Sequence, residues 1–178
     1  PALVDDVTER IFLPTLHALR KRGTPFTGLL YAGLMLTEEG PKVVEFNCRF
    51  GDPETQSIML RLQGDFAAVL HGAASGELPA TGLAWADGTA VCVIVAAAGY
   101  PDSPAVGDPI RHVDSTVDAT VFHAGTAIKD GKLVSAGGRV FGVTALGTDV
   151  HEARRRAYAV ADTIGLRGKQ LRRDIGLR

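Results

Sequence analysis

The chain has 178 residues, enough for one domain or two small ones, and its 46% hydrophobic content permits a sizeable core that is mostly aliphatic because only 6% of residues are aromatic. Lysine plus arginine (19) and aspartate plus glutamate (20) nearly balance, so no charge of one sign indicates nucleic acid or a membrane surface as a bulk partner. No apolar run is long enough to span a bilayer and no signal-peptide pattern opens the chain, so we expect a cytoplasmic protein.

The first segment predicts a helix that Asp5 or Asp6 caps and that ends at about Arg22. Pro14 interrupts its apolar pattern and is expected to bend it. The chain opens on Pro1, without an initiator methionine, and runs at once into this helical pattern. We therefore expect the chain to be a piece of a longer protein.

A hairpin is predicted next. Residues 27–36 are strand-like and mostly apolar, so they are expected to form a central strand. Residues 37–41 are the turn that returns the chain, antiparallel, as a strand containing Glu45. Tyr31 on the first strand could reach a ligand, but the expected role is that of a half-buried strand tyrosine.

The returning strand carries the polar residues of most interest. Side chains alternate along a strand, so Glu45 and Asn47 project to the same side, about 6.5–7 Å apart. A carboxylate and an amide oxygen are hard ligands of the kind that Mg²⁺ takes, with phosphates and water as the rest. Arg49 follows on the same alternation and could fork onto a carboxylate or phosphate. The solvated face of a half-exposed sheet would present the same three residue types, because charged side chains are mostly exposed.

The strand breaks at Gly51-Asp52-Pro53, and two helices follow, over residues 54–63 and 66–74. A linker rich in turn residues spans 76–88. We place a domain boundary near residues 60–64.

The second half predicts strands, a hairpin and a final helix. A glycine turn at Asp130-Gly131 indicates the hairpin. Asp149, with Glu152 three residues later, is a capping pair for a helix that runs to about Ile164. The tail from Leu166 is basic and has no assigned structure. The strands are expected over residues 89–98, 120–123, 127–129, 132–134 and 139–146.

Two further features have open interpretations. The pair Gly137-Gly138 before Arg139 lets the backbone approach a ligand closely, with the guanidinium clamping a phosphate, or it only shapes a turn beside a surface cation. Cys48 and Cys92 match no metal spacing, and we expect reduced core thiols rather than a disulfide.

Several of these strings together resemble one family. Glu45-Phe46-Asn47 followed by residues 49–54 (Arg-Phe-Gly-Asp-Pro-Glu) and Gln56 closely resembles the signature of the glycinamide ribonucleotide synthetase family. The pattern Glu-x-Asn-x-Arg is also similar to the metal-binding strand of ATP-grasp ligases. Residues 122–126, 137–140 and 173–176 resemble, in the same order, segments of the family's C-terminal domain. The resemblance covers essentially the whole chain but only the C-terminal part of the family's length.

This resemblance implies an α+β fold. Residues 1–62 would be the C-terminal portion of an ATP-grasp lobe, an antiparallel sheet with helices that includes the metal-binding strand. Residues 63–178 would be a small mixed α/β C-terminal domain. The implied reaction of de novo purine biosynthesis joins glycine to 5-phosphoribosylamine, uses ATP, passes through glycyl phosphate, and gives glycinamide ribonucleotide, ADP and phosphate.

The family resemblance also implies roles for particular residues. Glu45 and Asn47 would hold Mg²⁺, or Mn²⁺, that bridges the ATP phosphates, and Arg49 would stabilise the phosphoryl group in transfer. Asp52 and Glu54 are candidates for the amine of glycine or of the ribosylamine.

Arg139 would hold the ribose 5-phosphate. His123 could touch substrate, or it could simply bond to the backbone at a strand end.

The lobe that would contact adenine is missing from this sequence, so we expect the chain alone to be inactive, with the rest of the synthetase as its missing partner. Two alternatives remain open at this point. One is another ATP-grasp carboxylate–amine ligase, such as a carboxylating purine enzyme. The other is a non-catalytic binding module.

Overall fold

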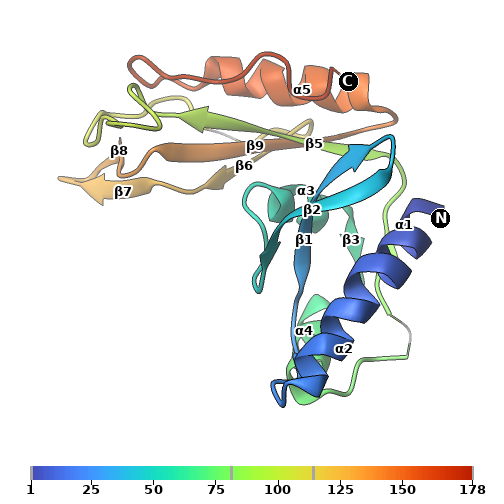
Figure 1. Cartoon of the computed structure of the whole chain (residues 1–178). Coiled ribbons are helices and arrows are strands. Elements are labelled where there is room, and N and C mark those ends of the chain that lie inside the picture. The colour runs from blue at the N-terminus through green and yellow to red at the C-terminus, as the bar shows by residue number, and fades with distance from the viewer. Residues whose placement is uncertain (1, 81, 114, 178) are drawn as a thin grey trace. The chain divides into compact units, whose positions relative to one another are not determined.

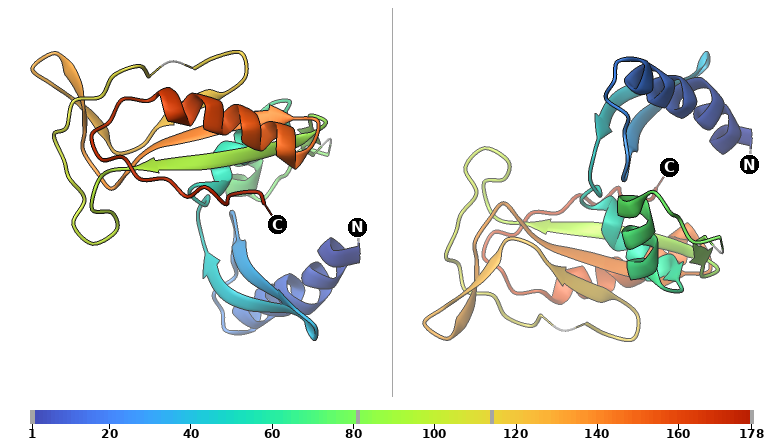
Figure 2. Two further views of the ribbon diagram at one scale, coloured as in Figure 1. Left: turned by 90° about the horizontal axis from the view of Figure 1, so that it is seen from above. Right: turned by 90° about the horizontal axis from the view of Figure 1, so that it is seen from below.

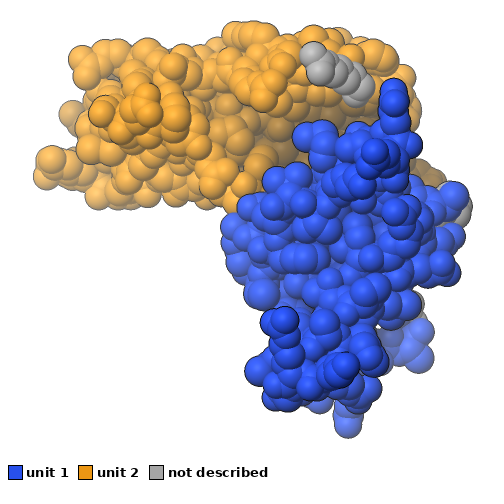
Figure 3. Space-filling view, in the orientation of Figure 1, with its two compact units in different colours: residues 1–51, 65–83 blue, residues 52–64, 84–178 orange. Residues whose placement is uncertain are grey.

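The computed structural model describes residues 2–80, 82–113 and 115–177. The chain forms two compact units: Pro1–Gly51 with Asp65–Leu83, and Asp52–Gly64 with Ala84–Arg178 (Figure 3). Both contain small antiparallel sheets and helices, so the predicted α+β class is confirmed. The predicted domain division between residues 62 and 63 stays a prediction.

The first unit opens with a long helix, drawn as one continuous ribbon in Figure 1 and composed of α1 (Ala2–Val7), a π-helical turn η1 (Thr8–Phe12) and α2 (Leu13–Lys21). The predicted cap at Asp5 or Asp6 is wrong, because α1 already includes both residues. The N–H of Leu13 donates to the carbonyl of Thr8, five residues back, immediately before Pro14. The interruption expected at Pro14 therefore takes the form of a widened turn, which accommodates a residue that has no N–H to donate.

Strands β1 (Tyr31–Thr37) and β2 (Gly40–Asn47) pair antiparallel, which confirms the predicted hairpin. The expectation that the first strand is central is wrong for the described residues, because β1 pairs with β2 alone and Met35 and Leu36 are exposed. An apolar run reveals the character of a strand but not the number of its neighbours.

The same unit contains α4 (Phe66–Ser75), whose N-terminus is capped by Asp65 through a 2.9 Å bond from the N–H of Ala68. The rings of Phe50 and Phe66 meet edge to face with centroids 5.6 Å apart. This aromatic contact joins the end of the hairpin segment to α4 within the unit.

The second unit is organised around a three-stranded sheet of order β5-β9-β6, all antiparallel. Its strands are β5 (Thr89–Ala96), β6 (Thr120–His123) and β9 (Arg139–Gly147). The predicted hairpin is confirmed as β7 (Thr126–Lys129) and β8 (Lys132–Ser135). Asp130 and Gly131 at its tip both have positive φ, 49° and 72°, as this tight turn requires. The remaining elements are α3 (Glu54–Arg61), β3 (Leu62–Gln63), β4 (Ala84–Trp85) and α5 (Val150–Thr163).

The two faces of this sheet are covered differently. Helix α5 lies across one face and α3 lies against the other (Figure 1). Val93, Val95, Phe141 and Val143 are fully buried in the main core, which also includes buried α5 residues such as Ala157. The alternate residues of β5, such as Cys92 and Ile94, are only half-buried. A cavity can therefore open on the α3 face without disturbing the core.

Both ends of α5 are capped by side chains. At its start, Asp149 accepts from the N–H of Glu152, and Glu152 accepts from the N–H and hydroxyl of Thr148 at 2.7 and 2.8 Å. The predicted capping pair is confirmed. At its end, the ammonium of Lys169 donates to the carbonyls of Ala161, Asp162 and Ile164, and desolvation lowers the pKa of this lysine.

The basic tail, for which no element was predicted, is held to β5 by backbone bonds. Ala96 and Gln170 exchange N–H to carbonyl bonds of 2.8 and 2.9 Å. Figure 2 shows the tail beside β5, and the guanidinium of Arg154 on α5 donates to the carbonyl of Ile175. The tail could not be predicted as a strand, because the single bridge between Ala96 and Gln170 leaves no alternating pattern of apolar residues in the sequence.

Both cysteines are free thiols, as expected, but they differ in environment. Cys92 is half-buried, and burial raises the pKa of its thiol. Cys48 is exposed, so its expected place in a core is wrong.

None of the helices in the described ranges combines the length and apolar character needed to cross a bilayer.

The cap of α5 gives a stability prediction. Asp149→Ala leaves the N–H of Glu152 without its side-chain acceptor and should lower the free energy of unfolding of the second unit by about 1 kcal/mol. Urea titration followed by the fluorescence of Trp85 measures this value. His151→Ala, an exposed change on the same helix, is the control and should alter stability by less than about 0.5 kcal/mol; equal effects of the two variants would contradict the assignment.

Glu152 gives a prediction of pH dependence. Its hydrogen bonds with Thr148 hold the pKa of the carboxyl below its ordinary value of 4.5. The ionised side chain therefore stabilises the fold fully above pH about 4.5, and this stabilisation disappears as the pH falls through the lowered pKa. Urea midpoints measured from about pH 6 downward should fall less steeply for Glu152→Gln than for the original chain, whereas Asp102→Asn, an exposed loop change, should keep the original slope.

Candidate functional site

The polar face of β2 forms the first part of the candidate site. The amide Nδ2 of Asn47 donates to Oε1 of Glu45 at 2.8 Å, so the two side chains lie side by side, as their alternation predicts. Glu45 is exposed and Asn47 is half-buried. The register places Tyr31 opposite Asn47, so this tyrosine belongs to the same face.

The neighbouring strand makes room for Glu45 through Gly33. These two residues are partners across the hairpin, and a Cβ at position 33 would lie 3.0 Å from Cγ of Glu45. The register also shifts between Gly33 and Leu34, whose partner is Val43, so Val44 is an extra residue just before Glu45. Such a bulge changes the direction of the side chains that follow it. Neither feature was visible in the sequence, because both depend on pairing across the hairpin.

Arg49 does not continue the strand, because β2 ends at Asn47. Its guanidinium donates to the carbonyl of Phe50 at 3.0 Å. The expectation that Arg49 lies on the same strand alternation is therefore wrong, and its proposed catalytic role stays a prediction.

The donor set on β2 fits a hard divalent cation that keeps most of its ligands from phosphate and water. The carboxylate of Glu45 and the amide oxygen of Asn47 can supply two adjacent oxygens once the amide turns its nitrogen away. Within the described residues, no three or more His, Cys, Asp or Glu side chains gather into a complete metal site. This face could therefore hold a metal ion together with a phosphorylated ligand.

The second unit contains another cluster of predicted site residues. Asp52 accepts through Oδ1 from the amide of Gln56 at 2.8 Å, and its Oδ2 lies 3.2 Å from Nη2 of Arg139. The same guanidinium donates through Nη1 to the Asp52 carbonyl at 2.8 Å, which joins residues 87 positions apart. In this arrangement Asp52 orients Arg139. Glu54 lies in the first turn of α3, where a carboxylate is favoured by the helix dipole.

The glycine pair before Arg139 serves close packing within the chain. A Cβ at Gly138 would lie 2.4 Å from Cδ2 of Tyr100, and one at Gly137 would lie 3.3 Å from the Cα of Gly125. The ring of Tyr100 thus occupies the space that a side chain at position 138 would take. His123, at the end of β6, pairs with Thr126 at 3.1 Å and stacks edge to face on Phe141.

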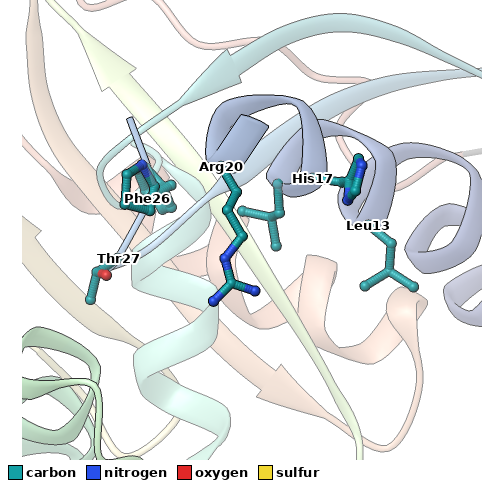
Figure 4. Close-up of a pocket in the computed structure, with 7 residues that line it drawn as sticks. Leu13, His17, Arg20, Phe26 and Thr27 are labelled. Carbon is teal, nitrogen blue, oxygen red and sulfur yellow. The ribbon is translucent and has the colours of Figure 1, made fainter. Parts of the chain in front are cut away.

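Each unit contains a hollow, and of these two hollows the one in the second unit is lined by a predicted site residue, Arg139. In the first unit, a depression of about 530 Å³ lies between α2 and the segment after it, and Figure 4 shows Leu13, His17 and Arg20 on its helical side. The predicted site residues do not line it. In the second unit, a cavity of about 440 Å³ is lined by Arg139 together with Tyr100 and Arg172, two residues that sequence reasoning missed. The sequence pointed to Arg172 only through its position next to residues 173–176, which resemble a segment of the family's C-terminal domain.

Two family models match the chain. The model described as "Phosphoribosylglycinamide synthetase, ATP-grasp (A) domain" matches residues 1–55, and the one described as "Phosphoribosylglycinamide synthetase, C domain" matches residues 90–178. Residues 56–89 lie outside both matches.

Relatives and solved structures agree with these matches. The chain is 49% identical over 184 residues to the phosphoribosylamine–glycine ligase of Streptomyces coelicolor, and 46% identical over 177 residues to that of Agrobacterium fabrum. These alignments cover 100% and 99% of the chain but only 44% and 42% of the relatives.

The crystal structure of phosphoribosylamine–glycine ligase from Thermotoga maritima matches with a TM-score of 0.83 and 38% identity, over 98% of this chain and 44% of that one. The biotin carboxylase domain of the Hydrogenobacter thermophilus 2-oxoglutarate carboxylase, with a TM-score of 0.61, 15% identity, and coverage of 86% and 34%, shares the fold alone. Family models at both ends and relatives along its whole length show that this chain belongs to the phosphoribosylglycinamide synthetase family.

Proposed function

We propose that this chain supplies the metal-holding hairpin and the C-terminal domain of a cytoplasmic phosphoribosylamine–glycine ligase. The observation that carries the proposal is the pair Glu45 and Asn47 on β2, whose Oε1 and Nδ2 atoms lie 2.8 Å apart. The pair lies in the part of the chain that matches the family's ATP-grasp model. The chain spans less than half the length of the relatives it matches, so the proposal assigns the remaining parts of the active site to sequence outside these 178 residues.

The proposed reaction has two steps that balance. A carboxylate oxygen of glycine bonds to the γ-phosphorus of ATP, the bond from that phosphorus to the bridging oxygen breaks, and ADP leaves. The amine nitrogen of phosphoribosylamine then bonds to the carbonyl carbon of glycyl phosphate, phosphate leaves, and the nitrogen loses a proton. The products are glycinamide ribonucleotide, ADP and phosphate, and the protein contributes mainly position and charge neutralisation.

Glu45 and Asn47 are the residues that would hold Mg²⁺ or Mn²⁺. A divalent cation bound there with the ATP phosphates would lower the negative charge that opposes attack on the γ-phosphorus. Gly33 contributes by leaving space for the Glu45 carboxylate. The hydrogen bond from the Asn47 amide to that carboxylate would be exchanged for metal contacts when the amide turns its oxygen toward the cation.

The other predicted residues have supporting roles in the proposal. Arg49 stabilises the phosphoryl group in transfer after its guanidinium leaves the Phe50 carbonyl. Asp52 and Glu54 are both candidates for a substrate amine, and Asp52 also pairs with Arg139 and Gln56. Arg139 holds the 5-phosphate of the ribosylamine.

The isolated chain should not turn over. A phosphate-release assay with glycine, phosphoribosylamine and MgATP should give no rate above background, because the proposal places the adenine-contacting lobe outside these residues. Sustained phosphate release by the 178-residue chain would contradict the proposal that other sequence supplies the adenine-contacting lobe.

A chimeric ligase tests the metal assignment. This chain replaces the matching segment of the Streptomyces coelicolor relative, and Glu45→Gln is compared with the unmodified chimera. Loss of the carboxylate charge should weaken the apparent Mg²⁺ affinity in the phosphate-release assay by at least about tenfold. Removing a residue that only supports a metal ligand already lowers metal affinity by about that factor.

Glu38→Gln, an exposed change in the turn of the same hairpin, is the matched control and should leave the Mg²⁺ dependence unchanged. An unchanged Mg²⁺ dependence in Glu45→Gln would refute the metal role. Replacing glycine by bicarbonate separates this ligase from a carboxylating relative, and activity with bicarbonate instead of glycine would overturn the proposed substrate.

A further inference from the structure

The cavity of about 440 Å³ in the second unit is bordered by two arginines from distant parts of the sequence. Arg139 begins β9, and Arg172 lies in the tail. Its floor is apolar, with Ile94 and Ala96 on β5 and Ile175 on the tail. A volume of this size suits a small ligand, and two cations on an apolar floor favour one that carries an anionic group at one end.

Backbone pairing fixes the two sides of the cavity relative to each other. Ala96 is the partner of Arg139 on one side and of Gln170 on the other. Neighbouring strands lie about 4.8 Å apart, so the Cα atoms of residues 139 and 170 are separated by about 10 Å, with Ala96 of β5 between them. Gln170 and Arg172 both line the cavity, so the tail brings an amide and a second guanidinium toward the space above Ala96.

Each guanidinium is oriented by a carboxylate, one from a distant segment and one from the tail itself. Arg139 is held by the side chain and carbonyl of Asp52, at 3.2 and 2.8 Å. Arg172 donates through Nε and Nη2 to the carboxylate of Asp174, with the Nε bond at 3.0 Å. A guanidinium has more N–H donors than these bonds use, so each arginine can bind an anion while its carboxylate partner keeps it oriented.

Tyr100 closes another side of the cavity. Its ring is partly exposed and packs over Gly138, where no Cβ is present. The wall beside Arg139 is therefore a flat aromatic surface with a hydroxyl, which suits the carbon face and hydroxyl groups of a sugar.

We infer that Arg172 is a second phosphate-binding residue and that, with Arg139, it holds the phosphate monoester of a pentose in this cavity. The inference rests on the proposed function for the identity of the sugar, because phosphoribosylamine has a phosphate monoester on a ribose. It adds to that function a residue from the tail, a wall formed by Tyr100, and a position for the ligand above Ala96.

Titration of the 178-residue chain with D-ribose 5-phosphate tests the inference, with ribose and inorganic phosphate as separate probes. Ribose 5-phosphate should bind more tightly than either part alone. Arg172→Gln should weaken its binding by about tenfold or more, since a charge-assisted bond is lost, and Arg172→Lys should recover part of the loss. Arg155→Gln removes an equally exposed arginine from α5, away from the cavity, and should change the affinity by less than about twofold.

A second measurement needs no variant. In the original chain, the Nε–H resonance of Arg172 should shift on addition of ribose 5-phosphate and stay in place on addition of ribose. Affinity unchanged in Arg172→Gln, an unmoved Arg172 resonance, or ribose 5-phosphate binding no better than ribose would each overturn the inference.

The sugar-phosphate site and the proposed ligase activity can be tested independently of each other. Sugar-phosphate binding by this chain needs neither nucleotide nor metal, whereas the Glu45 test needs both. An active chimera whose KM for phosphoribosylamine is unchanged by Arg172→Gln would remove the inference and leave the ligase. An inactive chimera with Arg172-dependent binding of ribose 5-phosphate would remove the ligase and leave the sugar-phosphate site.

Discussion

The second unit depends on β9, the strand with hydrogen-bonded neighbours on both sides. Val143, at its middle, faces Val93 and Val121 across the two interfaces and is fully buried in the core shared with α5. Seven of the nine residues of β9 are buried, so close packing holds the strand firmly along its length. Arg139 stands at the start of this strand, where a rigid support keeps a charged side chain in place.

Local sequence signals predicted the parts of the fold whose causes are local. The Asp130-Gly131 turn specified a hairpin because both residues tolerate positive φ, and Asp149 with Glu152 specified the start of a helix through their own hydrogen bonds. The missing neighbours of β1 and the pairing of the tail with Ala96 could not be predicted, because both depend on contacts between distant segments. Even the cap expected at Asp5 or Asp6 failed, because helical residues continue further toward the N-terminus.

In the candidate site, too, the features with local causes could be predicted and those that depend on distant contacts could not. Alternation along one strand was enough to place Glu45 beside Asn47. It was not enough for Arg49, which lies beyond the strand end, or for Asp52, whose partner Arg139 is 87 residues away. A sequence motif identifies which residues occur together in a family, but the distribution of their hydrogen bonds decides which of them remain available to a ligand.

Gly33 illustrates how a position without a side chain can belong to a functional centre. A methyl group there would lie 3.0 Å from Cγ of Glu45, so that side chain would have to shift by a few tenths of an ångström. If Glu45 binds a metal as proposed, a substitution at Gly33 would alter the metal site without changing either proposed ligand. A redesign of this hairpin for solubility should therefore keep the space above Gly33 open.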